Sequence, residues 1–173
     1  LAEARNENFR LDAWALSNLR LEAVDRAYSS RAAANSAHFL LPRFEDELGL
    51  YLARAVSTST EPNAMGLFLH YHLSALGLAA RWRENPDDAV LAARALATEA
   101  FALHFIEDSF SAGHVAGSWG SVAERKGTHD YYCEAGLDGA TWAGKLQTLK
   151  GDAHMRPEDL ERTALLVSDA WAQ

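Results

Sequence analysis

The sequence has a single cysteine, Cys133, so the chain can form no internal disulfide, and its compartment is left open. It has no uninterrupted apolar run of the roughly 18 residues that a membrane-spanning helix needs. No signal peptide is visible, and the chain opens on Leu1 rather than methionine, which suggests that a leader or larger precursor was removed. We therefore expect a protein without a transmembrane segment.

Basic residues are also fewer than acidic ones, which gives a formal net charge of −8. That acidity disfavours nonspecific binding to nucleic acid or to anionic membranes, so long nucleic acid is an unfavourable partner. Acidic side chains can instead neutralise bound cations. Apolar residues make up 49% of the chain, which is enough for a core, and 173 residues predict one domain spanning 1–173.

Strand signals are nearly absent, since no stretch alternates β-branched and polar residues, and the flanks of Asp138-Gly139 do not alternate. Spacing and composition predict helices over 9–29, 31–40, 44–56, 64–83, 88–110, 128–135 and from Pro157 onward. The helix at 64–83 is expected to be buried around most of its circumference. We expect a loop at 111–120 and irregular structure at 136–156. The predicted fold class is all-α, a single-domain irregular multi-helix bundle.

The candidate chemistry lies between Leu103 and Leu137, which contains His104, Asp108, His114 and His129, with Asp130 and Glu134 beside the last histidine. His104 and Asp108 are four residues apart, so they share one face of a helix. The same face continues back through Ala100, Ala97 and Ala93, which predicts that the pair points inward. A buried histidine–carboxylate pair needs a partner, either a metal ion or one another, and the two further histidines favour metal.

The remaining histidines are weaker candidates. His38 lies in an apolar stretch and, taken alone, is more typical of a core residue than of a ligand. His70 and His72 diverge by about 200° on a helix, so only one can face a site squarely; we take His72 as the candidate. His154 is expected in a loop and exposed.

The spacing His104-x3-Asp108-x5-His114 resembles that of the zinc-dependent phospholipase C and single-strand-specific nuclease superfamily. Residues 35–44 are similar to its N-terminal helix, where His38 would be the metal ligand. Residues 127–134 are similar to its later His-x3-acid element, and 157–171 to its last helix. The resemblance implies an all-α, phospholipase C/nuclease-like enzyme, periplasmic or secreted, that holds two or three zinc ions, with other divalent transition metals as substitutes.

Carried over to this chain, the resemblance implies that His104 and Asp108 hold one ion and that Asp108 bridges to a second, shared with His38. His114 and His129 would hold a third. Metal-activated water would attack a phosphodiester in a phospholipid head group or nucleotide, with Asp108 and Glu134 in catalytic roles. The later acid of the family is Cys133 here. Asp130 and Glu134 are preferred in its place, while Cys133 stays open as a thiolate ligand.

Two other interpretations remain. The His129-Asp130 pair is also the dyad of an HD-type metal phosphohydrolase, for which His104 and Asp152 would supply the earlier histidine and the later aspartate. A non-enzymatic helical binding module that keeps the fold and one structural metal is the third possibility. It is supported by the lack of an aligned aspartate between His38 and His104.

Overall fold

The computed structural model describes residues 20, 23–26, 36–44, 47–116 and 128–172. The fold there is mainly α, with one two-stranded sheet that the sequence did not predict. Most of the helix predicted at 9–29, and the first part of the one at 31–40, lie outside the described residues. The elements are η2 (Ser36–His38), α3 (Leu48–Ala55), α4 (Ala64–Glu84), α5 (Ala89–Asp108), α6 (Ala112–Ala116), α7 (His129–Ala135), β1 (Leu137–Ala140), β2 (Leu146–Leu149), η3 (Asp152–His154) and α8 (Pro157–Trp171).

The chain divides into two compact units. One contains Phe110–Arg162, and the other contains Ala37–Ser109 together with the residues from Thr163 onward. Helix α8 therefore begins in the first unit, and its later residues belong to the second.

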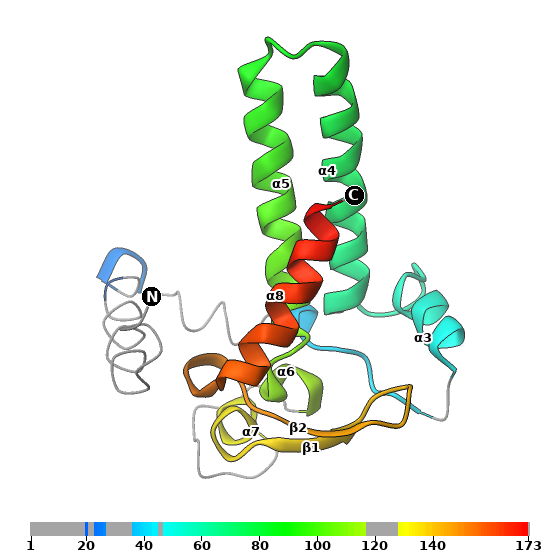
Figure 1. Ribbon diagram of the computed structural model, residues 1–173, viewed down its shortest axis with the longest axis vertical. Coiled ribbons are helices and arrows are strands. Elements are labelled where there is room, and N and C mark those ends of the chain that lie inside the picture. Colours follow the sequence, from blue (N-terminus) through cyan, green and yellow to red (C-terminus); the bar gives the residue numbers. More distant parts are fainter. Residues whose placement is uncertain (1–19, 21–22, 27–35, 45–46, 117–127, 173) are drawn as a thin grey trace. The chain divides into compact units, whose positions relative to one another are not determined.

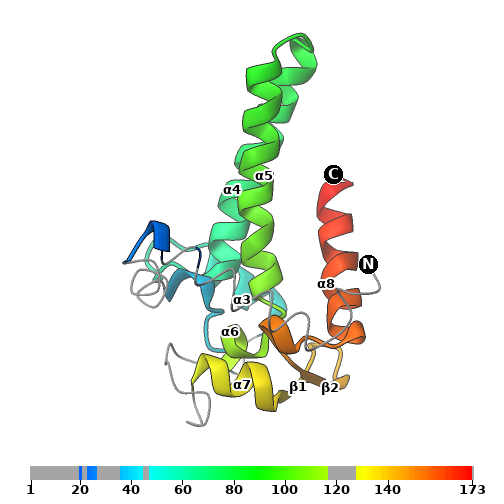
Figure 2. The ribbon, with the colours of Figure 1, turned by 90° about the vertical axis from the view of Figure 1, so that its left-hand side faces the viewer.

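The unit built on Ala37–Ser109 is organised by α4 and α5, which lie side by side and run in opposite directions (Figures 1 and 2). Side-chain caps fix where both helices begin. The Asn63 side chain accepts a hydrogen bond from the Gly66 amide at 2.9 Å and donates one to the Ala55 carbonyl at 2.9 Å, joining the end of α3 to the start of α4. The Asp88 side chain caps α5 by accepting from the Leu91 amide at 2.9 Å.

The core of this unit lies along one stripe of each helix, joined by the end of α8. Helix α4 buries only Ala64, Phe68, His72 and Ala75, and Leu73 is 64% exposed, so the prediction of burial around most of α4 was wrong. A helix that packs against one neighbour buries a stripe rather than its whole circumference. The core cluster consists of Ala64, Phe68, Ala102, Leu103, Phe105, Ile106 and Ala170.

The inward face predicted for α5 was also wrong in part. Ala93, Ala97 and Ala100 are exposed, while His104 and Asp108 are half-buried. Alanine is common both inside and outside proteins, so a row of alanines does not show which side of a helix is buried. The true buried stripe runs through larger side chains, among them Leu91, Leu103 and Ile106.

Helix α5 is long and apolar enough, by length and composition alone, to cross a membrane. Its apolar sequence is not continuous, because Arg94 and Glu99 interrupt it. The expectation of a protein without a transmembrane segment stays a prediction. Core helices and signal sequences pass the same test, and α5 packs against α4, so the observation is weak evidence for a membrane span.

The unit containing Phe110–Arg162 is built from α6, α7 and an antiparallel hairpin, β1–β2, in which Leu137 pairs with Leu149 and Ala140 with Leu146. Thr128 caps α7 by accepting a hydrogen bond from the Tyr131 amide. Helix α6 occupies part of the predicted loop, and the hairpin replaces the predicted irregular segment. Four-residue strands are too short to produce a clear alternating pattern, which is why both were missed.

Two glycines allow close approach in this unit. A Cβ atom on Gly113 would lie 2.6 Å from the His129 carbonyl oxygen and 2.8 Å from the Cys133 sulfur, so α6 packs on α7 only because this position lacks a side chain. A Cβ on Gly151 would lie 2.5 Å from the same sulfur. Figure 2 shows α6 above α7, followed by the hairpin.

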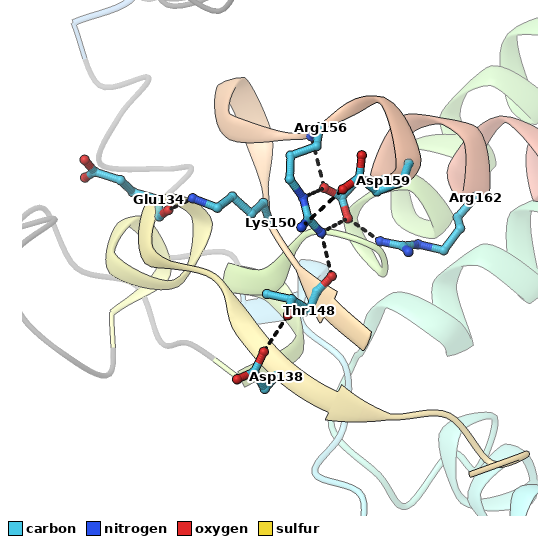
Figure 3. Close-up of polar contacts among 8 residues, drawn as sticks. Glu134, Asp138, Thr148, Lys150, Arg156, Asp159 and Arg162 are labelled. Atoms are coloured by element: carbon cyan, nitrogen blue, oxygen red, sulfur yellow. Dashed lines mark hydrogen bonds and ion pairs between the residues drawn. The ribbon is translucent and has the colours of Figure 1, made fainter. Parts of the chain in front are cut away.

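A polar network fixes the start of α8 in this unit (Figure 3). The Asp159 carboxylate, whose side chain is 0% exposed, accepts from the Arg156 backbone amide at 3.0 Å and from Arg156 Nε at 2.7 Å. It also accepts from Arg162 Nη2. Arg156 Nη2 in turn donates to the Thr148 carbonyl at 2.7 Å. The network therefore joins the start of α8 to strand β2. The segment between these two elements carries Asp152.

Candidate metal-binding groups

Two groups of side chains among the described residues could hold a metal ion, because their ligand atoms lie within 4.8 Å of one another. The first consists of His38, His104 and Asp108, and the second of His114, His129 and Asp152. Each group lies within a single unit of the fold. We call them the His104 group and the His129 group.

The His104 group brings together the 3₁₀ turn η2 and the last turns of α5. His38 Nδ1 lies 2.5 Å from Asp108 Oδ2, and both side chains are about three-quarters buried, being 23% and 25% exposed. The His38 and His104 rings are 5.0 Å apart between centroids. The family-like helix expected around His38 is only a single 3₁₀ turn over the described residues, followed by irregular chain.

His104 is held in a form that suits a ligand. Its Nδ1 donates a hydrogen bond to the Phe101 carbonyl one turn earlier on α5, which leaves Nε2 with its lone pair. Burial lowers the pKa of His104, and the nearby His38 acts in the same direction, whereas the Phe101 carbonyl and Asp108 oppose the shift. A neutral imidazole is the form that binds metal.

The His129 group draws its three residues from α6, α7 and η3. His114 and His129 are buried, at 6% and 3% exposure, while the Asp152 side chain is 31% exposed. The two histidine rings meet edge to face with centroids 4.5 Å apart. His129 Nε2 lies 3.5 Å from Asp152 Oδ2. Two imidazoles and one carboxylate thus face one another in a largely buried place.

Neighbouring polar groups orient this second set. His129 Nδ1 donates to Asp130 Oδ1 at 2.9 Å, so Nε2 carries the lone pair and faces Asp152. The Ser111 hydroxyl donates to Asp152 Oδ1 at 3.1 Å. A carboxylate on the far nitrogen of a ligating histidine is the usual arrangement in metal sites, where it fixes the tautomer and raises the basicity of the ring.

Asp152 is held in place by an unusual backbone conformation. Its φ is 48°, the left-handed region, and no other described residue except glycine has a positive φ. The Gly151 amide donates to the Cys133 carbonyl at 3.1 Å, which ties the turn to α7. Nonglycine residues in this region are often found where a side chain must be aimed. Here the turn aims Asp152 at His129.

Cys133 lies beside the His129 group. Its sulfur is 3.8 Å from His129 Nε2 and 3.4 Å from the Ser111 hydroxyl, and the residue is 2% exposed. Burial raises the pKa of Cys133 to about 12, and the negative charges of Asp152 and Asp130 add to the shift. Ser111 and the Gly113 backbone oppose it. Without a metal ion this thiol is therefore protonated at neutral pH.

The structure assigns different surroundings to the other predicted site residues. Asp130 binds His129 Nδ1 instead of joining the ligand group. Glu134 is exposed, and its backbone carbonyl accepts a hydrogen bond from Lys150 Nζ (Figure 3). His72 pairs with Glu99 rather than with either group. His154 is half-buried in η3 rather than fully exposed, which corrects that prediction.

Asp152 was absent from the ligand set that the family resemblance implied, and it was named only for the HD-type alternative. Its one local signal is position, since it follows glycine in a turn before α8. Comparisons with protein families, with curated proteins and with solved structures gave no match to this chain.

Proposed function

We propose that this protein is a metal-dependent phosphodiester hydrolase that uses zinc. The observation that carries the proposal is the His129 group. Three protein ligands of the nitrogen and oxygen type are characteristic of catalytic zinc, which keeps a further position for water or substrate. Structural zinc, by contrast, is usually held by four protein ligands.

The donor atoms of both groups fit this metal. Neutral imidazole and carboxylate are zinc ligands, and His104 and His129 each use Nδ1 in a hydrogen bond that leaves Nε2 for a ligand. A bound divalent ion would supply Lewis acidity toward the phosphoryl oxygens and would lower the pKa of water. No nucleophilic side chain is needed for that chemistry, and the protonated Cys133 is poorly suited to act as one.

Each residue then has a defined task. His114, His129 and Asp152 bind the metal, Asp130 holds the His129 ring, and Ser111 holds Asp152. In the His104 group the three side chains surround one place, so a single ion can be shared by all of them. The resemblance implies a further possibility that we include in the proposal, namely that Asp108 bridges two ions in this group. The protein would then hold two or three ions in total.

The test begins with metal content. Protein purified without chelator should contain zinc, manganese or iron at near-stoichiometric amounts and should hydrolyse bis(p-nitrophenyl) phosphate. Asp152→Asn should lower metal affinity by at least about tenfold and abolish hydrolysis. Asp87→Asn, an exposed acid in the turn between α4 and α5, is the matched control and should change neither. Protein that contains no transition metal and does not take one up would contradict the proposal.

The substrate class is a phospholipid head group or a nucleotide phosphodiester, supported by the superfamily resemblance, which also favours a periplasmic or secreted location. The net charge of −8 disfavours long nucleic acid. Parallel assays on phosphatidylcholine vesicles and on dinucleotides distinguish the two substrates. The HD-type alternative is supported by the short distance between His129 and Asp152. It is opposed by Asp130, which accepts a hydrogen bond from His129 Nδ1 and does not join the ligand group.

A second candidate function is a binding module with a structural zinc, favoured by the position of Cys133. With its sulfur 3.8 Å from His129 Nε2, a thiolate would make a fourth protein ligand and close the site. Cys133→Ser separates the two candidates. In the hydrolase it should leave metal content and hydrolysis nearly unchanged. In a structural site it should release the metal and melt the helices of that unit, as chelation would.

A further inference from the structure

A second chemical feature lies in the helical pair α4–α5 and takes no part in either metal-binding group. His72 on α4 and Glu99 on α5 face each other in the interior, at 4% and 7% exposure. His72 Nδ1 lies 3.0 Å and 2.9 Å from the two carboxylate oxygens of Glu99. Burying such a pair is costly, so its presence in a pair of alanine-rich helices calls for a reason.

The pair borders a cavity of about 250 Å³ between α4, α5 and the end of α8. Apart from the pair, the lining is entirely apolar: Ala75, Leu76, Ala79, Ala95, Leu96, Ala170 and Trp171. All of these residues belong to one unit of the fold. Apolar walls with one polar group, here the His72–Glu99 pair, are typical of small-molecule sites. The volume suits a small ligand with a single ring.

The hydrogen-bonding capacity of the pair is only partly used. A carboxylate accepts about four hydrogen bonds, and Glu99 receives one N–H donor, that of His72. With Nδ1 occupied by its hydrogen, a neutral His72 ring presents Nε2 as an acceptor. Phe68 stacks on the ring at 5.2 Å between centroids and holds its orientation. The remaining lone pairs of the Glu99 carboxylate can therefore accept further hydrogen-bond donors, as can Nε2 of a neutral His72 ring.

We propose that this cavity binds small apolar amines in their ammonium form. An ammonium group brings up to three donors and one positive charge to the His72–Glu99 pair, and its hydrocarbon part fills the space lined by alanine and leucine. Trp171, which is 52% exposed, lines the same cavity. The site is separate in its residues from both metal-binding groups, so the proposal stands apart from the hydrolase activity.

The experiment compares three ligands of equal size on the full chain, namely benzylamine, benzyl alcohol and benzoate. Titrations followed by protein-observed NMR should show saturable binding of benzylamine, with shifts at Leu76 and Leu96. The alcohol should bind at least about tenfold more weakly, since it lacks the charge. Equal binding of the alcohol would overturn the proposal. Stronger binding of benzoate would do the same, because it would mean that the pair presents a donor.

Variants locate the site. Glu99→Gln should lower benzylamine affinity about tenfold while leaving benzyl alcohol nearly unchanged. Glu84→Gln, an exposed acid at the end of α4, is the matched control and should have no effect. Asp152→Asn should also leave amine binding intact, which separates this site from metal coordination. If Glu99→Gln does not fold, Ala79→Leu at the cavity lining tests the same point by filling it. Undiminished amine binding in that variant would refute the site.

Discussion

Replacing Asp159 by asparagine should destabilise the unit that carries the His129 group. The carboxylate is fully buried and accepts four hydrogen bonds, three from Arg156 and one from Arg162. Asparagine keeps the shape, but it has no charge and turns an NH2 group toward guanidinium donors. Arg156 would then lose its hold on Asp159 while still contacting the Thr148 carbonyl of β2.

The size of the loss in free energy of unfolding depends on how deeply Asp159 and its two arginine partners are buried. Removing one partner of a buried ion pair costs about 3–5 kcal/mol, and one hydrogen bond to a charged group is worth about 1.5–3 kcal/mol. The Arg156 and Arg162 side chains are 34% and 26% exposed, so water can replace part of what they lose. We therefore expect a loss of about 2–3 kcal/mol, equivalent to a fall in Tm of roughly 5–10 °C.

The loss should depend on pH. Burial alone would raise the pKa of Asp159, but the hydrogen bonds from Arg156 and the charges of Arg156 and Arg162 outweigh it and hold the pKa below its ordinary value. A lowered pKa in the folded state gives stability that is fully present above the pKa of an unfolded aspartate, about 3.9, and is lost as the pH falls through the folded value. The difference between wild type and variant should shrink below about pH 4.

Urea unfolding followed by circular dichroism, at pH 7 and pH 3, measures both effects. Asp169→Asn, an exposed acid on the same helix, is the control and should stay within about 0.5 kcal/mol of wild type. If Asp159→Asn matches this control at pH 7, the network has no stabilising role. A difference that persists unchanged at pH 3 would show that the loss comes from packing and not from charge.

Three further predictions concern single residues. Gly113→Ala should cost about 1–3 kcal/mol in thermal unfolding because its Cβ would collide with α7, whereas Gly77→Ala, which meets nothing within 4 Å, should be neutral or stabilising. Asp130→Asn should weaken zinc binding about 10–100-fold in competition with a chelating dye, with secondary structure intact, and unchanged affinity would rule out its orienting role. Asn63→Ala should lower the free energy of unfolding by about 1–2 kcal/mol, and no loss would mean that the α4 cap is dispensable.

Local sequence was enough to predict the elements whose signals are local. The helices α4, α5 and α8 follow from spacing and composition and, for α8, from Pro157 in a first turn. The spacing of His104 and Asp108 placed them on one face of α5, because i and i+4 neighbours depend only on helix geometry. The histidines of both candidate groups could be predicted as ligands because imidazole binds metal whatever the fold around it.

What the sequence could not supply is which distant side chains meet. Asp152 lies beside His129 because the hairpin β1–β2 brings the chain back toward α7 and because Gly151 allows a close approach to Cys133. Short strands and a turn have no clear sequence pattern, so these contacts could not be predicted. Likewise, His72 was a metal candidate until α5 placed Glu99 against it. The sequence by itself determined the longer helices and the histidines of both candidate groups, since helix signals rest on neighbours within a few residues and the ligand chemistry of a histidine needs no fold. Only the tertiary structure decided which ligands share a site, because that depends on contacts between residues far apart in the chain.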